Sequence, residues 1–227
     1  MRTKSQRFHL RIRSIHLVVF ILMMSQTLYS QSALSGLGIE IGGGYNQLLW
    51  QSPSSLFPGS NETRFDRTHF ALTPEVRLNY NILLADKFTC IPFVGYNRFG
   101  GQGEDSPVLQ NGIKLVKSTV WFDALEVGFF TTYIVSDFSF GIGYKANRQF
   151  KVTDIVDIPN VLMPNTDVTD SFPTWSHDIG LRMSYRLSHY SISAESWFGI
   201  SDLGGNGGFS QMNIRQNHFR LLFGYTI

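Results

Sequence analysis

The sequence predicts an all-β fold, an eight-stranded antiparallel up-and-down transmembrane β-barrel. Three observations predict it: a leader typical of exported proteins, apolar residues that alternate with polar ones along eight segments, and connections that are short and long in turn. No segment has the apolar recurrence at three and four residues that an amphipathic helix needs.

Residues 1–31 have the pattern of a secretory signal peptide. Basic residues between Arg2 and Arg13 precede the apolar run Leu17–Met24, and small and polar residues follow it. The run is too short to cross a membrane as a helix, which takes about 20 residues. We therefore expect residues 32–227 to form the outer-membrane β-barrel domain of the mature protein.

The charge balance argues against binding to nucleic acid. Five of the 19 Lys and Arg lie in the leader and none of the 17 Asp and Glu does, so its removal changes the net charge from +2 to −3. Phosphate binding relies on basic patches, and we therefore expect no nucleic-acid partner. Cys90 is the single cysteine, which excludes an internal disulfide. We expect no cofactor and no bound metal.

Residues 69–80 show the alternation well: Phe70, Leu72, Val76, Leu78 and Tyr80 interleave with polar residues. The same pattern runs through 125–129, 138–145, 178–186, 192–198 and 218–227, and segments 37–50 and 87–99 complete the eight. Segment 87–99 has apolar residues on both faces, so its phase is open. Pro74 cannot donate a ladder hydrogen bond, and we expect a β-bulge there.

The connections alternate in length. Short ones fall at 84–87, 135–137 and 187–190, and long ones, rich in Gly, Pro, Asn, Asp and Ser, fall at 51–66, 100–118, 148–174 and 201–214. Outer-membrane barrels have tight periplasmic turns and longer external loops. With an even number of strands, both the N- and the C-terminus are then expected in the periplasm.

Charged residues share the polar face of these strands. Glu40 and Asp178 belong to this face, and the charge network we expect in the lumen, with a structural role, comprises Glu75, Arg77, Glu126, Lys145, Arg182, Arg186, Glu195 and Arg220. An eight-stranded barrel is just wide enough for its own side chains, so these groups should pair across the interior while the apolar face meets lipid. A soluble lipocalin-like carrier, with the apolar face inward, is the alternative.

The whole mature chain resembles the small OmpA/OmpX-type outer-membrane barrels in its leader, its eight strands and its unequal loops. The stretches IPFVGYNRFGG (91–101) and FRLLFGYTI (219–227) are similar to the generic outer-membrane β-barrel domain, including its PorT-like members. The resemblance implies the outer membrane of a Gram-negative-type bacterium and a last strand that the barrel-insertion machinery reads. Ile227 stands where that family usually has a terminal aromatic residue.

Two groups of residues invite a catalytic interpretation. Ser176, His177 and Asp178 contain the residue types of a hydrolase triad, but neighbours on a strand point to opposite faces, so His177 faces away from both others. His69 and His218 should point inward, where a histidine could serve a lipid-modifying enzyme as general base. No matching serine or acid is identifiable, so we expect no catalytic residue.

The long connections carry other candidate features. Asp154, Asp157, Asp167 and Asp170 offer oxygen ligands for calcium, but their spacing matches no EF-hand, and a solvated acidic loop is expected. The apolar residues Leu48, Leu49, Trp50, Leu56, Phe57, Val161, Leu162, Met163 and Phe172 could form a partner surface or pack together over the barrel end.

The function that these features favour is non-enzymatic. We expect a barrel that anchors surface loops for envelope integrity, adhesion or partner docking, and the PorT-like resemblance adds an accessory role in secretion. The expected partners are outer-membrane lipid, the insertion machinery at the last strand and a protein at the external loops. An envelope-lipid-modifying barrel enzyme and a narrow pore are the alternatives.

Overall fold

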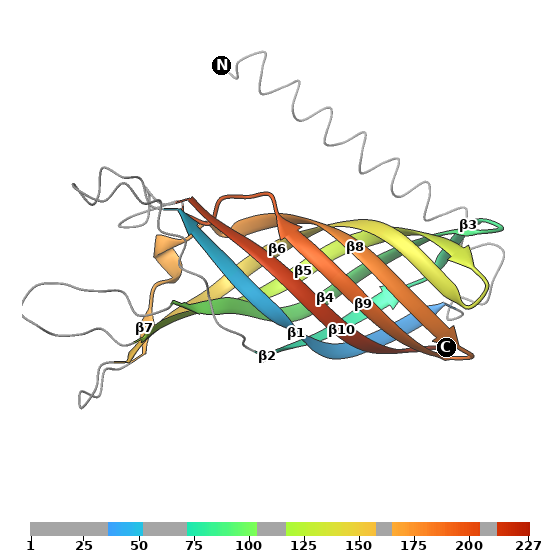
Figure 1. The fold of residues 1–227 in the computed structure, drawn as a ribbon, viewed down its shortest axis with the longest axis horizontal. Helices are drawn as coiled ribbons and strands as arrows, with labels where there is room; N and C mark the ends of the chain where they lie inside the picture. The colour runs from blue at the N-terminus through green and yellow to red at the C-terminus, as the bar shows by residue number, and fades with distance from the viewer. Residues whose placement is uncertain (1–35, 52–71, 104–116, 158–164, 205–212) are drawn as a thin grey trace, which may run out of the picture. The chain divides into compact units, whose positions relative to one another are not determined.

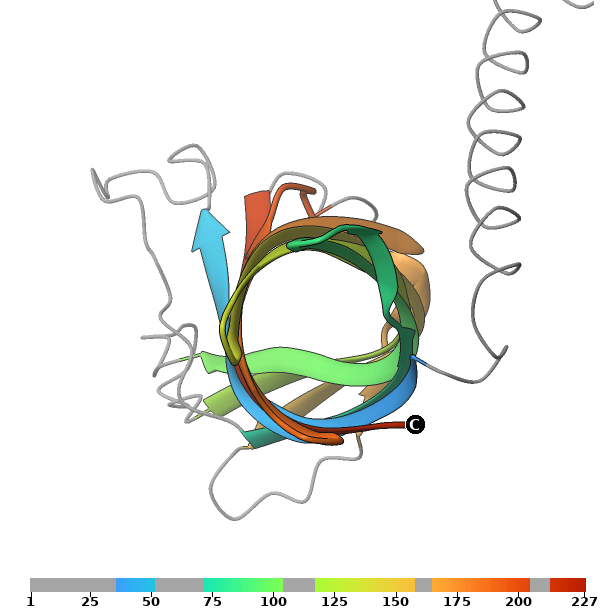
Figure 2. The same ribbon diagram turned by 90° about the vertical axis from the view of Figure 1, so that its right-hand side faces the viewer.

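The strands form a closed antiparallel ring in the computed structural model (Figures 1 and 2). The structure describes residues 36–51, 72–103, 117–157, 165–204 and 213–227. The predicted leader, residues 1–31, lies outside the described residues, as do most of the long connections predicted at 51–66, 100–118 and 201–214. Among the residues that the structure describes, none forms a helix with the length and hydropathy of a transmembrane span.

The predicted number of strands is confirmed. The strands are β1 (Leu37–Gln51), β2 (Leu72–Tyr80), β3 (Ile82–Ala85), β4 (Phe88–Gly103), β5 (Lys117–Val135), β6 (Phe138–Asp157), β8 (Trp175–Leu187), β9 (Tyr190–Gly199) and β10 (Asn213–Thr226). β2 and β3 are two parts of one barrel strand, interrupted at Asn81. The pairing of β1 with β10 and of β2 with β4 closes the ring.

Three two-residue hairpins join neighbouring strands at one end of the barrel: Asp86–Lys87, Ser136–Asp137 and Ser188–His189. They lie at the three short connections that the sequence predicts. Ser136 and Ser188 have φ values of 55° and 56°, the left-handed conformation that tight hairpins require. β10 ends at this same end, whereas β7 (Thr166–Asp167) and the 3-10 helix η2 (Thr169–Ser171) lie at the other (Figure 1).

One predicted connection is shorter than expected. β6 continues to Asp157, so the connection placed at 148–174 begins ten residues later than its predicted start, and it contains β7 and η2. Asp154 and Asp157 therefore belong to a strand and not to a loop. The strand continues because β5 runs beside it along its whole length, from Lys117 opposite Asp157 to Val135 opposite Phe138.

The apolar residues of each alternating series face outward. Ile142 is 67% exposed, and the outer face also carries Ile39, Ile41, Val76, Leu78, Val94, Leu125, Val127, Phe129, Phe138, Phe140, Ile179, Leu181, Met183, Ile192, Phe219, Leu221 and Phe223. Charged residues on the opposite phase are buried inside the barrel. An outward apolar band around a polar interior is the arrangement of a transmembrane barrel and the reverse of a soluble carrier.

The structure also settles the phase of β4 and the place of the bulge. Ile91, Phe93 and Phe99 are buried in the interior, while Val94 faces outward. The β5–β6 ladder shifts register so that Phe150 has no partner in β5. The bulge predicted at Pro74 is wrong, because the β1–β2 ladder passes that residue without a shift and the β2–β4 ladder only begins at Glu75.

Candidate functional site

Four charged side chains of alternating sign form a layer across the interior near the hairpin end. They are Glu40 of β1, Arg77 of β2, Arg182 of β8 and Glu195 of β9, and each is at most 6% exposed. Arg77 Nε donates to Glu40 Oε2 at 2.5 Å and Nη1 to Glu195 Oε2 at 3.0 Å. Arg182 Nη1 donates to Glu195 Oε1 at 2.6 Å and also pairs with Glu40. Each guanidinium thus contacts both carboxylates.

A second charged layer lies farther from the hairpin end. Arg220 of β10 forms an ion pair with Glu75 and donates to Glu126 Oε2 at 3.2 Å. Lys145 Nζ is 3.1 Å from the same Glu126 oxygen and 3.7 Å from Asp178 Oδ2. Arg77 Nη1 lies 3.4 Å from Glu75 Oε1 and so connects the two layers. Charges from seven strands thereby form one network.

Arg186 is the predicted network residue that the structure places elsewhere. Its side chain is exposed, because it lies one residue before the end of β8, where the barrel opens at the hairpins. The other seven residues of the predicted set are all buried and linked by ion pairs. Such pairing offsets the desolvation cost of each ion, and removal of one partner leaves a costly buried charge.

Three aromatic side chains, which the sequence analysis did not predict to face inward, fill the space beside the charged layers. Phe130 lies 5.7 Å from Phe93 and 4.9 Å from Trp197 between ring centroids. The guanidinium of Arg77 lies 4.7 Å from the centroid of Phe93, and Lys145 Nζ lies 4.7 Å from that of Trp197. Cations and aromatic faces attract each other in such contacts, so the rings stabilise the charges as well as excluding water.

The room for these rings comes from glycines on the facing strands. Gly180 lies opposite Trp197 and Gly143 opposite Phe130. A Cβ at Gly180 would approach Trp197 to 2.4 Å, and one at Gly143 would approach Phe130 to 2.6 Å. The sequence carries only part of this signal: the three aromatic residues lie on the polar phase of their strands, but the glycines opposite two of them are known only from the strand register.

An apolar cluster closes the interior at the end away from the hairpins. Phe99 and Phe122 stack with their ring centroids 4.8 Å apart, and Phe172 packs edge-on against Phe122 at 5.0 Å. The buried members of the cluster also include Leu48, Val120, Ala124, Val152, Leu203 and Ile214. The apolar residues of the connections could form a partner surface or pack together over the barrel end, and Leu48 and Phe172 pack over the barrel end. Trp50, Leu56, Phe57 and 161–163 lie outside the residues whose side chains are described.

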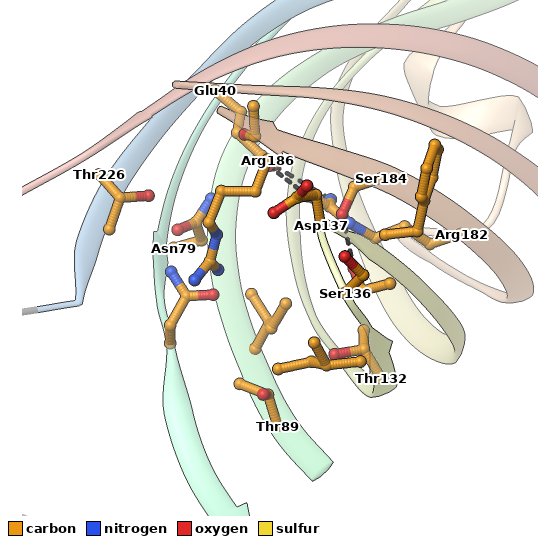
Figure 3. Close-up of a pocket in the computed structure, with 16 residues that line it drawn as sticks. Glu40, Asn79, Thr89, Thr132, Ser136, Asp137, Arg182, Ser184, Arg186 and Thr226 are labelled. Atoms are coloured by element: carbon orange, nitrogen blue, oxygen red, sulfur yellow. Dashed lines mark hydrogen bonds and ion pairs between the residues drawn. The ribbon is translucent and has the colours of Figure 1, made fainter. Parts of the chain in front are cut away.

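A small polar vestibule remains at the hairpin end (Figure 3). Its volume is about 90 Å³, and Glu40 and Arg182 of the first charged layer contribute to its walls. Asn79, Arg186 and several Ser and Thr side chains also line it. Asn79 Oδ1 and Arg182 Nε are buried without a protein partner, so this space suits a few water molecules. The vestibule therefore ends at the charged layer.

In the described part of the chain, the residues that invited a catalytic interpretation point in different directions. Ser176 and Asp178 are buried inside, whereas His177 faces outward and its Nδ1 lies 2.7 Å from the Tyr144 hydroxyl. His218 is buried and hydrogen-bonds Asn46, with Asp178 4.0 Å away. His69 lies outside the described residues. The strand alternation used to reject the triad thus agrees with the observed directions of these side chains.

Two of the acidic residues named as possible calcium ligands, Asp154 and Asp167, have their surroundings described. Asp154 lies in β6 opposite Thr166, while Asp167 accepts hydrogen bonds from Thr169 N at 3.0 Å and Oγ1 at 2.6 Å. These bonds stabilise the ionised form and lower the pKa of Asp167 below its usual value. Within the described residues, no three His, Cys, Asp or Glu side chains are placed to hold a metal ion.

Known structures with a similar fold are outer-membrane proteins. The chain resembles the attachment invasion locus protein Ail of Yersinia pestis (TM-score 0.43, 13% identity, covering 85% of this chain and 99% of Ail). It resembles Neisserial surface protein A (TM-score 0.49, 10% identity, covering 85% of this chain and 98% of that protein). It also resembles the outer membrane protease OmpT of Escherichia coli (TM-score 0.48, 11% identity, covering 88% of this chain and 100% of OmpT). No protein-family model and no curated sequence matches the chain. These likenesses concern the fold alone, and the resemblance to PorT-like members stays a prediction.

Proposed function

We propose that this protein is a non-enzymatic anchor of the outer membrane, whose closed barrel holds four connecting segments at the external surface and has both chain ends in the periplasm. The observation that carries the proposal is the filled interior. Charged layers, aromatic rings and a terminal apolar cluster follow one another along the barrel axis.

The division of the barrel into a sealed interior and long external segments supports an anchoring role. Segments 52–71, 104–116, 158–164 and 205–212 all connect strands at the end away from the two-residue hairpins. A rigid scaffold that presents variable connections is the usual arrangement for binding proteins. In this proposal partner binding depends on those segments, and the lumen contributes only rigidity.

The positions of the nucleophile and base candidates also favour a non-enzymatic role. His218 is 2% exposed among amide and charged partners, so a substrate cannot reach it without opening the barrel. His177 lies on the outer face with Tyr144, away from the buried Ser176. A general base must lie within reach of the proton that it abstracts, and neither residue meets this condition.

We expect the wild-type protein to give no steady conductance in a planar lipid bilayer, because its lumen is filled. The double substitution Arg182→Ala and Glu126→Ala removes one member from each charged layer and should raise the conductance. Arg186→Ala, at the exposed mouth, is the matched control and should leave the baseline unchanged. Steady channels in the wild type, or no change in the double variant, would count against the plugged-anchor proposal.

A further inference from the structure

Three cations face outward at the end of the barrel away from the hairpins. Arg98 of β4, and Arg148 and Lys151 of β6, are exposed on the same side of the sheet as the apolar band. Arg98 and Lys151 lie in one row with Asp123 of β5 between them, and Arg148 lies opposite Trp175 of β8. We call Arg98, Arg148, Lys151 and the exposed aromatic residues Phe150 and Trp175 the outer basic patch.

The β-bulge of β6 builds this patch. Because Phe150 is the unpaired residue, both it and Lys151 reach the outer face, although neighbours on a regular strand would point in opposite directions. Phe150 is 52% exposed and Trp175 49%, and the ring of Phe150 lies 6.3 Å from that of Tyr96. The bulge therefore places a cation and an aromatic ring together, where a regular strand would have turned one of them inward.

The patch lies at the depth of lipid headgroups. Arg148 is ten residues along β6 from Phe138, which begins the apolar band beside a hairpin. At a rise of about 3.3 Å per residue and a tilt of about 40°, the two lie about 25 Å apart along the membrane normal. The apolar band of such barrels is about 25 Å tall, so Arg148 sits at its outer edge. Trp and Tyr residues are enriched at this level.

The carboxylates near the patch leave two of its cations without ion pairs. Asp123 accepts from Arg98 Nε at 2.7 Å and Nη2 at 3.1 Å, and from the Tyr96 hydroxyl at 2.5 Å. Asp167 is occupied by Thr169. Among the described residues, neither Arg148 nor Lys151 has a carboxylate oxygen within 4.0 Å.

We propose that the outer basic patch binds the phosphate monoester of a lipid headgroup in the leaflet at the long-connection end. Two cations without a close ion pair can bind a dianion, and the planar guanidinium of Arg148 suits bidentate hydrogen bonding to phosphate oxygens. Phe150 and Trp175 offer apolar and aromatic surface to the adjoining lipid. This binding concerns the outer face, and it does not depend on whether the lumen is plugged.

Native mass spectrometry of the detergent-purified protein tests the proposal, with phosphatidic acid and phosphatidylcholine of the same acyl chains as probes. Each exposed cation near anionic lipid contributes roughly a fivefold gain in affinity, so Arg148→Gln with Lys151→Gln should weaken phosphatidic acid binding about 25-fold. Phosphatidylcholine binding should not change. Arg215→Gln is the matched control, because Arg215 is an exposed cation of β10 near the same end.

These measurements distinguish specific binding at the outer basic patch from non-specific attraction of anionic lipid to surface cations. An effect confined to the double variant, with retained heat-modifiable migration as proof of folding, supports the site. Equal losses in the double variant and in Arg215→Gln, or equal wild-type affinity for the two lipids, would overturn it. Full displacement of phosphatidic acid by equimolar inorganic phosphate would also overturn it, since the ligand would then be free phosphate and not a lipid.

Discussion

Replacing Glu195 with alanine is expected to lower the free energy of unfolding by about 3 to 5 kcal/mol, the usual cost of removing one partner from a buried charge pair. Glu195 accepts hydrogen bonds from Arg77, Arg182 and the Trp197 indole Nε1, the last at 2.9 Å. Without it, two buried guanidinium groups compete for Glu40 and the aromatic layer loses its polar partner. Urea titration of the protein in lipid vesicles, followed by tryptophan fluorescence, measures the change.

Two further variants make the Glu195 result specific. Glu195→Gln keeps the volume and one acceptor oxygen, so it should cost less than the alanine substitution. Arg186→Ala removes a charge that is exposed at the hairpin end and should change the free energy of unfolding by less than about 0.5 kcal/mol. A decrease in the free energy of unfolding below about 1 kcal/mol for Glu195→Ala would show that the buried ion pairs of Glu195 do not stabilise the folded barrel as expected.

Replacing Ile142 with arginine is expected to cost about 2 to 4 kcal/mol of folding free energy in a lipid bilayer, the depth-dependent cost for a cation on the lipid face near the bilayer midplane. Ile142 lies on β6 between Phe140 and Tyr144 of the outward series and is 67% exposed. In water, an exposed isoleucine could be replaced by arginine at almost no cost. Urea titration in vesicles measures the difference.

The control for Ile142→Arg is the same substitution at a position nearer the membrane interface. Leu187 is also largely exposed but is the last residue of β8, beside a hairpin, where the membrane interface is expected. Leu187→Arg should therefore cost about 0 to 1 kcal/mol. Equal costs for the two substitutions would contradict the assignment of the apolar band to the membrane.

The sequence predicts which face of each strand points inward, because charged side chains must face the interior of the barrel and not the lipid. Arg77, Glu126 and Arg220 cannot face lipid, and the period of two then fixes the direction of every neighbour on the same strand. Arg186 shares the phase of Arg182, but periodicity carries no information on where the barrel ends, so its exposure was not predictable. The inward face of β4 could not be predicted in this way, because Ile91 and Phe93 are apolar and yet face inward.

The interior packing could not be read from the sequence in the same way. Phe93, Phe130 and Trp197 lie on the polar phase, and only the cross-strand register brings Gly180 and Gly143 opposite two of them. Register is a property of pairs of strands, and a single strand does not encode it. The bulge at Phe150 likewise depends on how β5 and β6 align, whereas Pro74 tolerates its place because the β2–β4 ladder begins after it.

Heat modifiability tests whether this chain is a lipid-spanning barrel with an inward charge network. The protein is purified from the membrane fraction in detergent, and its gel migration and circular dichroism are compared before and after boiling. We expect a β-rich species that migrates faster when unboiled and that requires detergent or lipid to stay in solution. A monomer that remains soluble without detergent, with the same migration before and after boiling, would contradict it.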